Sequence, residues 1–376
     1  MENKLPASLA ELLAQLDAQG VTDYRRYRRV QKYLCLKAKE KNIPITGSFE
    51  LTPLCNLDCK MCYVHLNKTD LNGVNLLTLE QWKSIMEQAV SAGMMYAKLT
   101  GGECLTYPGF RDLFLFLQDH GVGVYVLSNG LLIDEEMTAF FQNHPPAGIQ
   151  ITLYGASEEG YEHVTGRRVF TEVMKNIRRL HDTEIPLCVS VTPNAYMCDG
   201  EDVLRLLHKE GLVYSINSGL HQPREETGRA LADAELETYI SMFKLQRQLR
   251  GIDENQVKDT KKQFDQLKEE FPTKGVLCGA GRNGFSINWQ GGMQPCSTFP
   301  CDAESVLKLG FIEAWSRTNT AALNYPLPAE CACCLYRSAC KGCVAEHAAG
   351  AMPGHANPQI CKWGKEMVAN GLLYLQ

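Results

Sequence analysis

Short runs of β-branched and aliphatic residues alternate along the chain with longer stretches whose apolar residues recur at helical spacing. The apolar runs predict strands over residues 45–51, 95–100, 122–127, 148–153, 186–192 and 212–217. The stretches between them predict helices near residues 78–92, 108–120, 134–143, 170–182 and 200–210. Strand–helix alternation of this kind predicts an α/β fold built on a parallel sheet. Six such units are too few for a closed barrel of eight strands, so we expect an open, partial (β/α)6 TIM-like barrel.

The segments outside this alternating region, which spans 45–228, have different patterns. Residues 1–44 predict an N-terminal helical segment, in which residues 24–41 carry a dense basic face. Such a face is usually solvated, and the functional alternative is a docking surface for an acidic peptide or a redox partner. Residues 229–275 are highly charged and predict a connector of one or two helices. In residues 276–376 periodicity is weak and Gly, Pro and Cys are frequent, which predicts a small loop-rich domain held by bound clusters.

Composition and charge narrow the class of protein. The 376 residues are 45% hydrophobic and 22% charged, which is typical of a globular protein. A net charge of −5 gives no whole-molecule attraction for nucleic acid, so no nucleic-acid partner is expected. The first residues lack a basic stretch followed by an apolar core, and no apolar run approaches the roughly 18 residues of a membrane span. We therefore expect a cytoplasmic protein without a membrane partner.

The chain has 16 cysteines, a number that in a cytoplasmic protein indicates metal or cluster ligation rather than disulfides. Cys55, Cys59 and Cys62 form a C-x3-C-x2-C loop directly after the first predicted strand. Three thiolates on one loop can hold three irons of a [4Fe–4S] cluster and leave the fourth open to a cofactor or substrate. Because the strand ends of α/β barrels carry the active site, we predict the catalytic centre here. Zinc ligation is the alternative.

Four short motifs follow the next four predicted strands. They are Thr100-Gly101-Gly102-Glu103, Ser128-Asn129-Gly130, Thr152-Leu153-Tyr154-Gly155 and Val191-Thr192-Pro193-Asn194. In this order, together with the cysteine loop, they resemble the signature of the radical S-adenosylmethionine (SAM) superfamily. The resemblance implies a [4Fe–4S] cluster on the loop, at which SAM is reductively cleaved. It implies SAM contacts from Tyr63, Gly101, Gly102, Glu103, Ser128 and Thr152 and adenine contacts near residues 191–194.

Within the first of these motifs, Thr100-Gly101-Gly102-Glu103, the resemblance gives each residue type a role. The two glycines allow close approach of the backbone, and the carboxylate of Glu103 receives the amino group of SAM. Cys104 follows, where the superfamily usually has proline. A thiol at this position is a candidate hydrogen-atom donor to a substrate radical, and the alternative is that it packs in the core. A basic contact to the SAM carboxylate is also expected, with Arg167, Arg168 or another residue as candidates.

The second group of cysteines lies in the C-terminal region. Its members are Cys278, Cys296, Cys331, Cys334, Cys340, Cys343 and Cys361. Their spacing is similar to that of the SPASM domain, although two residues separate Cys340 from Cys343 where the family has three. The resemblance implies two auxiliary [4Fe–4S] clusters, one on Cys331, Cys334, Cys340 and Cys361 and the other on Cys278, Cys296 and Cys343. The second cluster has either an open iron or a fourth ligand from Cys301 or Cys333, and structural zinc is the alternative reading of the group.

The resemblance also implies a function, since SPASM relatives mostly act on peptides and proteins. We expect an oxidoreductase of RiPP maturation, a radical SAM enzyme that oxidatively cross-links a ribosomally synthesised peptide. The alternatives are a radical peptide epimerase that uses Cys104, a dehydrogenase of a sugar or alcohol, and a non-catalytic Fe–S scaffold. Expected partners are the peptide and an electron donor such as flavodoxin or ferredoxin. Because the first 44 residues do not resemble a winged-helix leader-binding module, we expect the leader to be presented either by a separate leader-binding protein or by the basic N-terminal helices and the connector.

Overall fold

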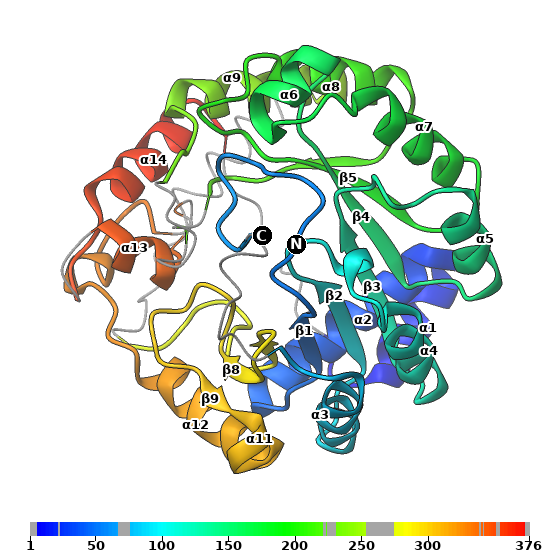
Figure 1. Cartoon of the computed structure of the whole chain (residues 1–376). Coiled ribbons are helices and arrows are strands. Elements are labelled where there is room, and N and C mark those ends of the chain that lie inside the picture. Colours follow the sequence, from blue (N-terminus) through cyan, green and yellow to red (C-terminus); the bar gives the residue numbers. More distant parts are fainter. Residues whose placement is uncertain are drawn as a thin grey trace.

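A parallel sheet curves through the centre of the molecule (Figure 1). The computed structural model describes residues 6–21, 23–66, 76–220, 223, 231–252, 274–337, 340, 342–350 and 354–372. The strands of the barrel are β1 (Thr46–Glu50), β2 (Tyr96–Thr100), β3 (Gly123–Ser128), β4 (Gly148–Leu153), β5 (Leu187–Val191) and β6 (Tyr214–Ile216). Each pairs in parallel with the next, so these strands lie side by side in chain order. The prediction of an open, partial barrel is confirmed.

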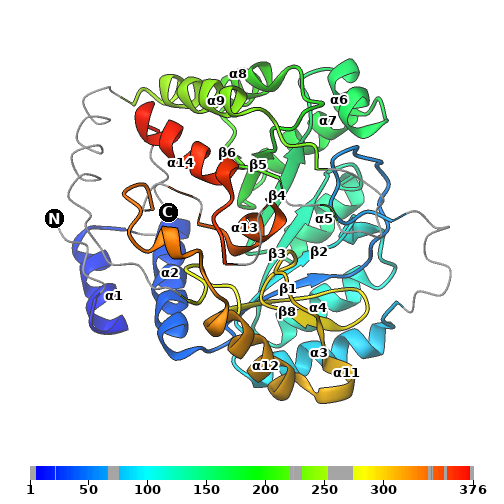
Figure 2. The same ribbon diagram turned by 90° about the vertical axis from the view of Figure 1, so that its left-hand side faces the viewer.

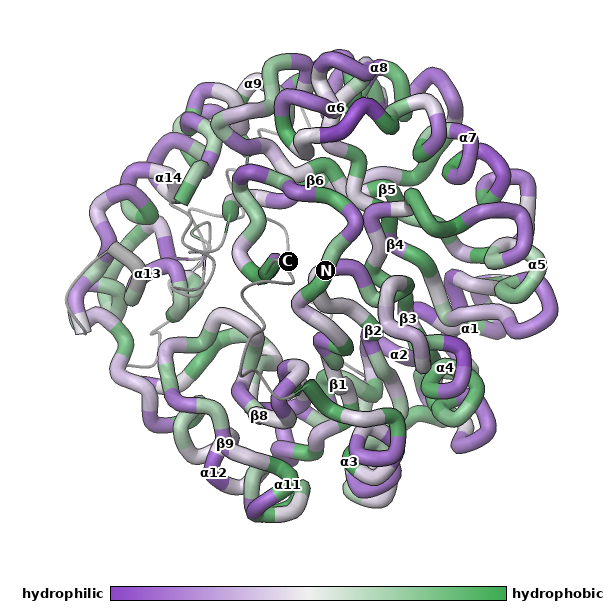
Figure 3. The backbone as a smooth tube through the Cα atoms, viewed as in Figure 1, coloured by the Kyte–Doolittle hydropathy of each residue, from purple (hydrophilic) through white to green (hydrophobic). Residues whose placement is uncertain are grey.

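The helices between these strands cover the outside of the barrel. They are α3 (Leu79–Ser91), α4 (Phe110–Asp119), α5 (Glu135–Asn143), α7 (Phe170–His181) and α8 (Gly200–Lys209), all at predicted places. α3 begins with a capping box, in which Thr78 and Gln81 each accept the main-chain N–H of the other. The helices pack on strand residues such as Leu99, Val126 and Ile151, which are completely buried in one core. Their outward turns are largely hydrophilic (Figure 3).

The structure also contains elements that the sequence pattern does not predict. α6 (Glu158–Thr165) lies between β4 and α7. Later in the chain, β7 (Gly284–Ile287) pairs in parallel with β1, and β8 (Gly292–Gln294) and β9 (Glu304–Ser305) extend the sheet by antiparallel pairing. Four helices of the described C-terminal residues follow: α11 (Val306–Leu309), α12 (Phe311–Asn324), α13 (Val344–Gly350) and α14 (Pro358–Ala369).

The C-terminal region is therefore more regular than expected. The expectation of a loop-rich stretch without a sizeable apolar core is wrong for residues 284–324. Phe285 of β7 packs against Phe49 of β1 and Phe311 of α12, with ring centroids 5.8 and 5.1 Å apart, so the core of the barrel continues into this region. Strands of 4, 3 and 2 residues are too short to show an alternating pattern, which is why the sequence did not indicate them.

The predicted N-terminal helices are α1 (Leu9–Ala18) and α2 (Asp23–Lys41), and they lie at the end of the barrel opposite the loop that follows β1 (Figure 2). Part of the basic face of α2 is used within the protein. Arg28 donates to the hydroxyl of Tyr125 in β3 at 3.5 Å, and Lys39 donates to the carbonyl of Leu277. These contacts fix α2 against the sheet and reduce the surface that remains for a docking partner.

The predicted connector contains α9 (Leu236–Leu249), while residues 253–273 lie outside the described residues. α9 packs beside α8, and the hydroxyl of its Tyr239 donates to the carbonyl of Pro193 at 3.2 Å. The connector is thus attached to the barrel at the end of β5. None of the helices in the described part of the chain is long and apolar enough to cross a membrane.

Candidate active site

The cysteine loop (residues 51–66) follows β1 and carries Cys55, Cys59 and Cys62. The end of β2 holds its first residues. The N–H of Gly102 donates to the carbonyl of Thr52 at 2.7 Å, and the N–H of Glu103 donates to the carbonyl of Leu54 at 2.8 Å. Two backbone segments that are far apart in sequence are therefore bonded at the predicted catalytic end of the barrel.

The two glycines are required by this close approach. Gly101 has a φ of +142°, and a Cβ atom on it would overlap the carbonyl oxygen of Thr52. A Cβ atom on Gly102 would overlap the carbonyl oxygen of Leu54. The close backbone approach that the structure shows is made to the cysteine loop, and contact of the two glycines with SAM stays a prediction.

α6 holds the other side of the cysteine loop. The N–H of Asp58 donates to the carbonyl of Thr165 at 3.1 Å, and the N–H of Lys60 donates to the carbonyl of Val164 at 3.0 Å. α6 ends at Gly166, whose φ of +72° is the left-handed conformation that glycine adopts at helix ends. The unpredicted helix α6 thus contributes directly to the position of the cysteines.

The sulfur atoms of the loop accept N–H groups. The Sγ of Cys55 accepts the main-chain N–H of Leu57 at 3.4 Å and the side-chain amide of Asn129 at 3.6 Å. The Sγ of Cys62 accepts the N–H of His65 at 3.3 Å. Such donors suit thiolate ligands, since hydrogen bonds to sulfur tune iron–sulfur clusters. Burial raises the pKa of Cys55 to about 12, and the nearby carboxylate of Glu103 adds to this shift.

The three cysteines face one cavity of about 590 Å³, a size typical of small-molecule and cofactor sites. Residues at the ends of the barrel strands and of the C-terminal region line it, among them Cys55, Cys59, Cys62, Tyr63, Gly101, Gly102, Ser128, Asn129, Gln150, Thr152, Tyr154, Thr192, Asn217, Cys343 and Glu346. Five of the six residues predicted to contact SAM thus share a cavity with the cysteine loop. The chemistry of the set fits a cluster and SAM, because thiolates and polar strand-end groups meet there.

In the described part of the chain, no three His, Cys, Asp or Glu side chains converge where one metal ion would bind. This observation does not bear on a [4Fe–4S] cluster. Each thiolate of such a cluster binds a different iron, so the ligands surround a larger object than a single ion.

Glu103 is the predicted SAM contact that does not line the cavity. Its side chain is 1% exposed, and its carboxylate accepts the N–H of Asn129 at 2.7 Å, the N–H of Leu105 at 3.0 Å and the hydroxyl of Ser128 at 3.1 Å. Burial raises the pKa of Glu103, and the hydrogen bonds from Asn129, Leu105 and Ser128 oppose that shift. That Glu103 binds the amino group of SAM stays a prediction. In the structure its carboxylate joins the ends of β2 and β3 through these hydrogen bonds.

Cys104 also lies away from the cavity wall. Its side chain is completely buried in the main core, and its thiol donates to the carbonyl of Leu127 at 3.3 Å. Burial raises the pKa of this thiol well above its usual value. The geometry agrees with the packing alternative for Cys104 rather than with the hydrogen-donor hypothesis.

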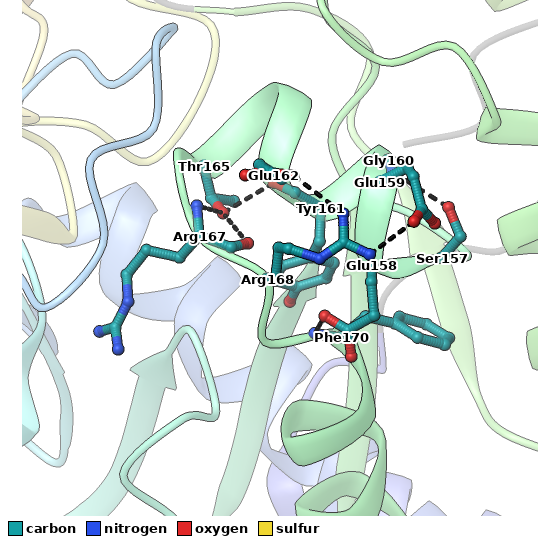
Figure 4. A network of polar contacts seen from close by, with 10 residues as sticks. All are labelled: Ser157, Glu158, Glu159, Gly160, Tyr161, Glu162, Thr165, Arg167, Arg168 and Phe170. Atoms are coloured by element: carbon teal, nitrogen blue, oxygen red, sulfur yellow. Dashed lines mark hydrogen bonds and ion pairs between the residues drawn. The ribbon is translucent and has the colours of Figure 1, made fainter.

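The structure separates the two candidate arginines (Figure 4). Arg168 pairs with Glu159 and Glu162 of α6 at the surface, at 2.5 and 3.0 Å. Arg167 points away from this network and donates to the carbonyl of Asn56 in the cysteine loop at 2.8 Å. Of the two, Arg167 is therefore the one beside the predicted cluster.

The C-terminal cysteines form two neighbourhoods. Burial raises the pKa of Cys340, hydrogen bonding and Arg337 lower it, and the nearby thiols of Cys331 and Cys361 raise it. The pKa of Cys361 is raised by burial and then by Cys334. In the other neighbourhood, burial raises the pKa of Cys296 and the thiol of Cys278 adds to this shift. Burial also raises the pKa of Cys343, and the thiol of Cys296 is among the further causes. The division matches the two ligand sets that the resemblance implies, whose roles stay predictions.

Comparison with known proteins gives consistent results. The sequence matches the Radical SAM superfamily over residues 49–193. It is 26% identical over 257 residues to SkfB, the sporulation killing factor maturation protein of Bacillus subtilis, an alignment that covers 68% of this chain and 60% of SkfB. It is 24% identical over 330 residues to the AdoMet-dependent heme synthase of Methanosarcina barkeri, covering 81% of this chain and 92% of the synthase.

Among solved structures, Streptococcus suis SuiB bound to S-adenosylmethionine has a similar fold. The TM-score is 0.63 at 15% identity, and the superposition covers 93% of this chain and 86% of SuiB. At this identity the likeness concerns the fold alone. The superfamily match runs from the end of β1 through β5 and includes the cysteine loop and the cavity residues at the ends of β2 to β5. Residues 49–193 therefore form a radical SAM domain, a family that uses a [4Fe–4S] cluster and SAM.

Proposed function

We propose that the protein is a radical SAM enzyme that oxidatively cross-links a ribosomally synthesised peptide. The single observation that carries this proposal is the shared cavity. Cys55, Cys59 and Cys62 face it together with the strand-end motifs of the barrel, and Cys343 and Glu346 face it from the C-terminal region. When bound, the cluster and SAM supply a 5′-deoxyadenosyl radical that abstracts hydrogen from an unactivated carbon.

The residues of the chain hold and orient these groups. Cys55, Cys59 and Cys62 are the proposed cluster ligands, and the main-chain atoms of Gly101 and Gly102 border the space left for SAM. The hydroxyls of Ser128 and Thr152 face the same cavity. The wall of the cavity reaches from the barrel to Cys343 and Glu346 of the C-terminal region.

The relatives support a peptide substrate. SkfB is a maturation protein by name, and one structure of SuiB holds its precursor peptide SuiA. Cross-linking removes two hydrogens from the peptide. One leaves as a hydrogen atom in 5′-deoxyadenosine and the other as a proton, and one electron passes to an acceptor. An auxiliary cluster beside Cys343 would be such an acceptor, and a flavodoxin or ferredoxin would supply the electron that SAM cleavage consumes.

A second candidate is oxidation of a small molecule. The alignment with the heme synthase covers more of both chains than the alignment with SkfB does. A tetrapyrrole or another carboxylate-bearing compound would then occupy the cavity. Peptide and small-molecule substrates give different products, so the assay below distinguishes the two candidates.

The experiment uses protein reconstituted without oxygen. Iron and sulfide are counted, and 5′-deoxyadenosine formation from SAM and dithionite is compared with that of the Cys55/Cys59/Cys62→Ala triple variant. We expect about twelve irons per chain for three clusters and activity in the wild type only. Candidate precursor peptides and tetrapyrroles are then offered, and products are analysed by mass spectrometry in heavy water.

Loss of two hydrogens from a peptide supports cross-linking, whereas uptake of one deuterium at Cα indicates the epimerase alternative. Modification of a tetrapyrrole without any peptide product favours the second candidate. A cluster-loaded wild type that forms no 5′-deoxyadenosine would refute the enzyme and leave the Fe–S scaffold.

A further inference from the structure

A turn in the C-terminal region brings a cysteine outside the predicted ligand set next to one inside it. Cys296 and Cys301 lie at the two ends of this turn. The N–H of Phe299 donates to the carbonyl of Cys296 at 3.2 Å, and the N–H of Cys301 donates to the carbonyl of Phe299 at 2.8 Å. The side-chain amide of Gln294 in β8 donates to the carbonyl of Cys301 at 2.7 Å, which fixes the far end of the turn to the sheet.

Both cysteines pack against the same small apolar cluster. Its buried members are Val276, Phe299, Ala322, Leu327 and Val344. Val276 precedes Cys278 by two residues, and Val344 directly follows Cys343. The chain segments that carry Cys278, Cys296, Cys301 and Cys343 therefore converge on one cluster of side chains.

Cys333 has a different environment. It is exposed, and it lies between Cys331 and Cys334, which belong to the other neighbourhood. It is not among the residues that pack against the apolar cluster around Val344. The sequence left Cys301 and Cys333 as equal candidates, and the structure favours Cys301.

We infer that Cys301 is the fourth thiolate of the auxiliary cluster site formed by Cys278, Cys296 and Cys343. Four thiolates fit a [4Fe–4S] cluster completely, so no iron of this site is open to a substrate thiolate or carboxylate. What this ligation means for catalysis rests on the proposed function. The site would take up the electron released by the substrate, and it would not hold the substrate in the cavity.

The test isolates the auxiliary sites. In the Cys55/Cys59/Cys62→Ala background we add Cys301→Ser or, as the matched control, Cys333→Ser. Each protein is reconstituted, oxidised mildly with ferricyanide and examined by EPR and iron analysis. A cluster with only three cysteine ligands loses its unsupported iron and gives the signal of a three-iron cluster. We expect the background and Cys333→Ser to keep about eight irons per chain, and Cys301→Ser to lose about one.

A second measurement does not depend on whether the Cys301→Ser protein folds. Cyanide binds to an open iron and shifts the EPR spectrum of the reduced cluster, so the background protein with Cys301 intact should show no shift. A shift in this protein, a three-iron signal that appears without any change at Cys301, or zinc in place of iron would overturn the inference. Neither measurement uses SAM or a peptide, so failure of the proposed function would be recognised separately, by the absence of product.

Discussion

The carboxylate of Glu103 accepts the main-chain N–H of Asn129 at 2.7 Å, which joins the end of β2 to the end of β3. The same carboxylate accepts the hydroxyl of Ser128, and Asn129 in turn donates its amide to the sulfur of Cys55 at 3.6 Å. A buried chain of hydrogen bonds therefore leads from β2 through β3 to the cysteine loop. These hydrogen bonds couple the position of Cys55, a predicted cluster ligand, to that of the cavity wall at Ser128 and Asn129.

Replacement of Glu103 tests this chain. Glu103→Gln keeps the shape but removes the charge that holds Asn129 and Ser128, and we expect a loss of about 1–3 kcal/mol in the free energy of unfolding, measured in urea. Formation of 5′-deoxyadenosine should fall as well. Glu80→Gln on the exposed face of α3 is the control and should change neither quantity. Unchanged stability with a raised KM for SAM would instead support the direct SAM contact.

The amide of Asn129 should affect the cluster itself. Asn129→Ala removes a hydrogen bond to the sulfur of Cys55, and fewer hydrogen bonds to sulfur make the reduction potential more negative. We expect a lower potential of the SAM-binding cluster in a redox titration followed by EPR. Asn324→Ala, at the end of α12, is the control. An unaltered potential in Asn129→Ala would show that this contact does not reach the cluster.

The two neighbouring arginines should respond differently to replacement. Arg167→Ala removes the contact to the carbonyl of Asn56, so we expect a higher KM for SAM and a slower formation of 5′-deoxyadenosine. Arg168→Ala removes only exposed ion pairs to Glu159 and Glu162 and should leave both parameters unchanged. Equal effects of the two replacements would contradict the assignment of Arg167 to the active site.

Cys104 should be dispensable for chemistry. Its thiol is buried in the core, so Cys104→Ala should destabilise the protein by about 1 kcal/mol and leave the product unchanged. The measurement is product analysis in heavy water together with thermal unfolding. Loss of a deuterated product in the variant, at unchanged 5′-deoxyadenosine formation, would restore Cys104 as a hydrogen donor and with it the epimerase alternative.

Stability should depend on pH through Glu158. Its carboxylate accepts the N–H of Phe170 at 3.2 Å (Figure 4). It also accepts the N–H of Thr171 at 2.8 Å, at the start of α7, where the preceding Val169 has no capping side chain. The hydrogen bonds from Thr171 are the main cause of its lowered pKa. A lowered folded-state pKa adds stability above the ordinary pKa of glutamate, and this stability is lost as the pH falls through the folded-state value.

Glu158→Ala should therefore cost about 1 kcal/mol at neutral pH, which is typical of a lost helix cap. The difference from wild type should shrink as the pH is lowered below the usual glutamate range. Urea unfolding at several pH values measures both effects, and Glu184→Ala at an exposed position serves as the control. A difference that stays constant with pH would show that the charge of Glu158 is not involved.

The sequence predicted most of the barrel, because each of its strands is a compact apolar run followed by a helix with a clear apolar face. It missed α6, whose eight residues include only a few apolar side chains. It identified the cysteine loop and the strand-end motifs, since these are short and contiguous. It could not show that Ser128 and Asn129 donate hydrogen bonds to Glu103, because these residues are far from Glu103 in the sequence and meet it only in the folded chain.

The same limit applies to Cys301. Spacing alone gave no reason to prefer Cys301 to Cys333. The turn that places Cys301 near Cys296 is held by the hydrogen bond from the side-chain amide of Gln294 in β8 to the carbonyl of Cys301. β8 itself is 3 residues long and left no recognisable pattern. When the ligands of one site come from several loops, the sequence therefore predicts only those ligands whose spacing matches that of a known family.

The pairing of β7 with β1 has a consequence for how the protein is made. Thr46 lies opposite Gly284 in this ladder, so the first strand to leave the ribosome waits for a partner that is synthesised more than two hundred residues later. Until then one edge of β1 is open, and exposed strand edges invite pairing with other chains. Long-range pairing of this kind is also slow to form. A nascent chain of this protein therefore presents an aggregation-prone edge for most of its synthesis, and shortened versions that end before β7 would keep it permanently.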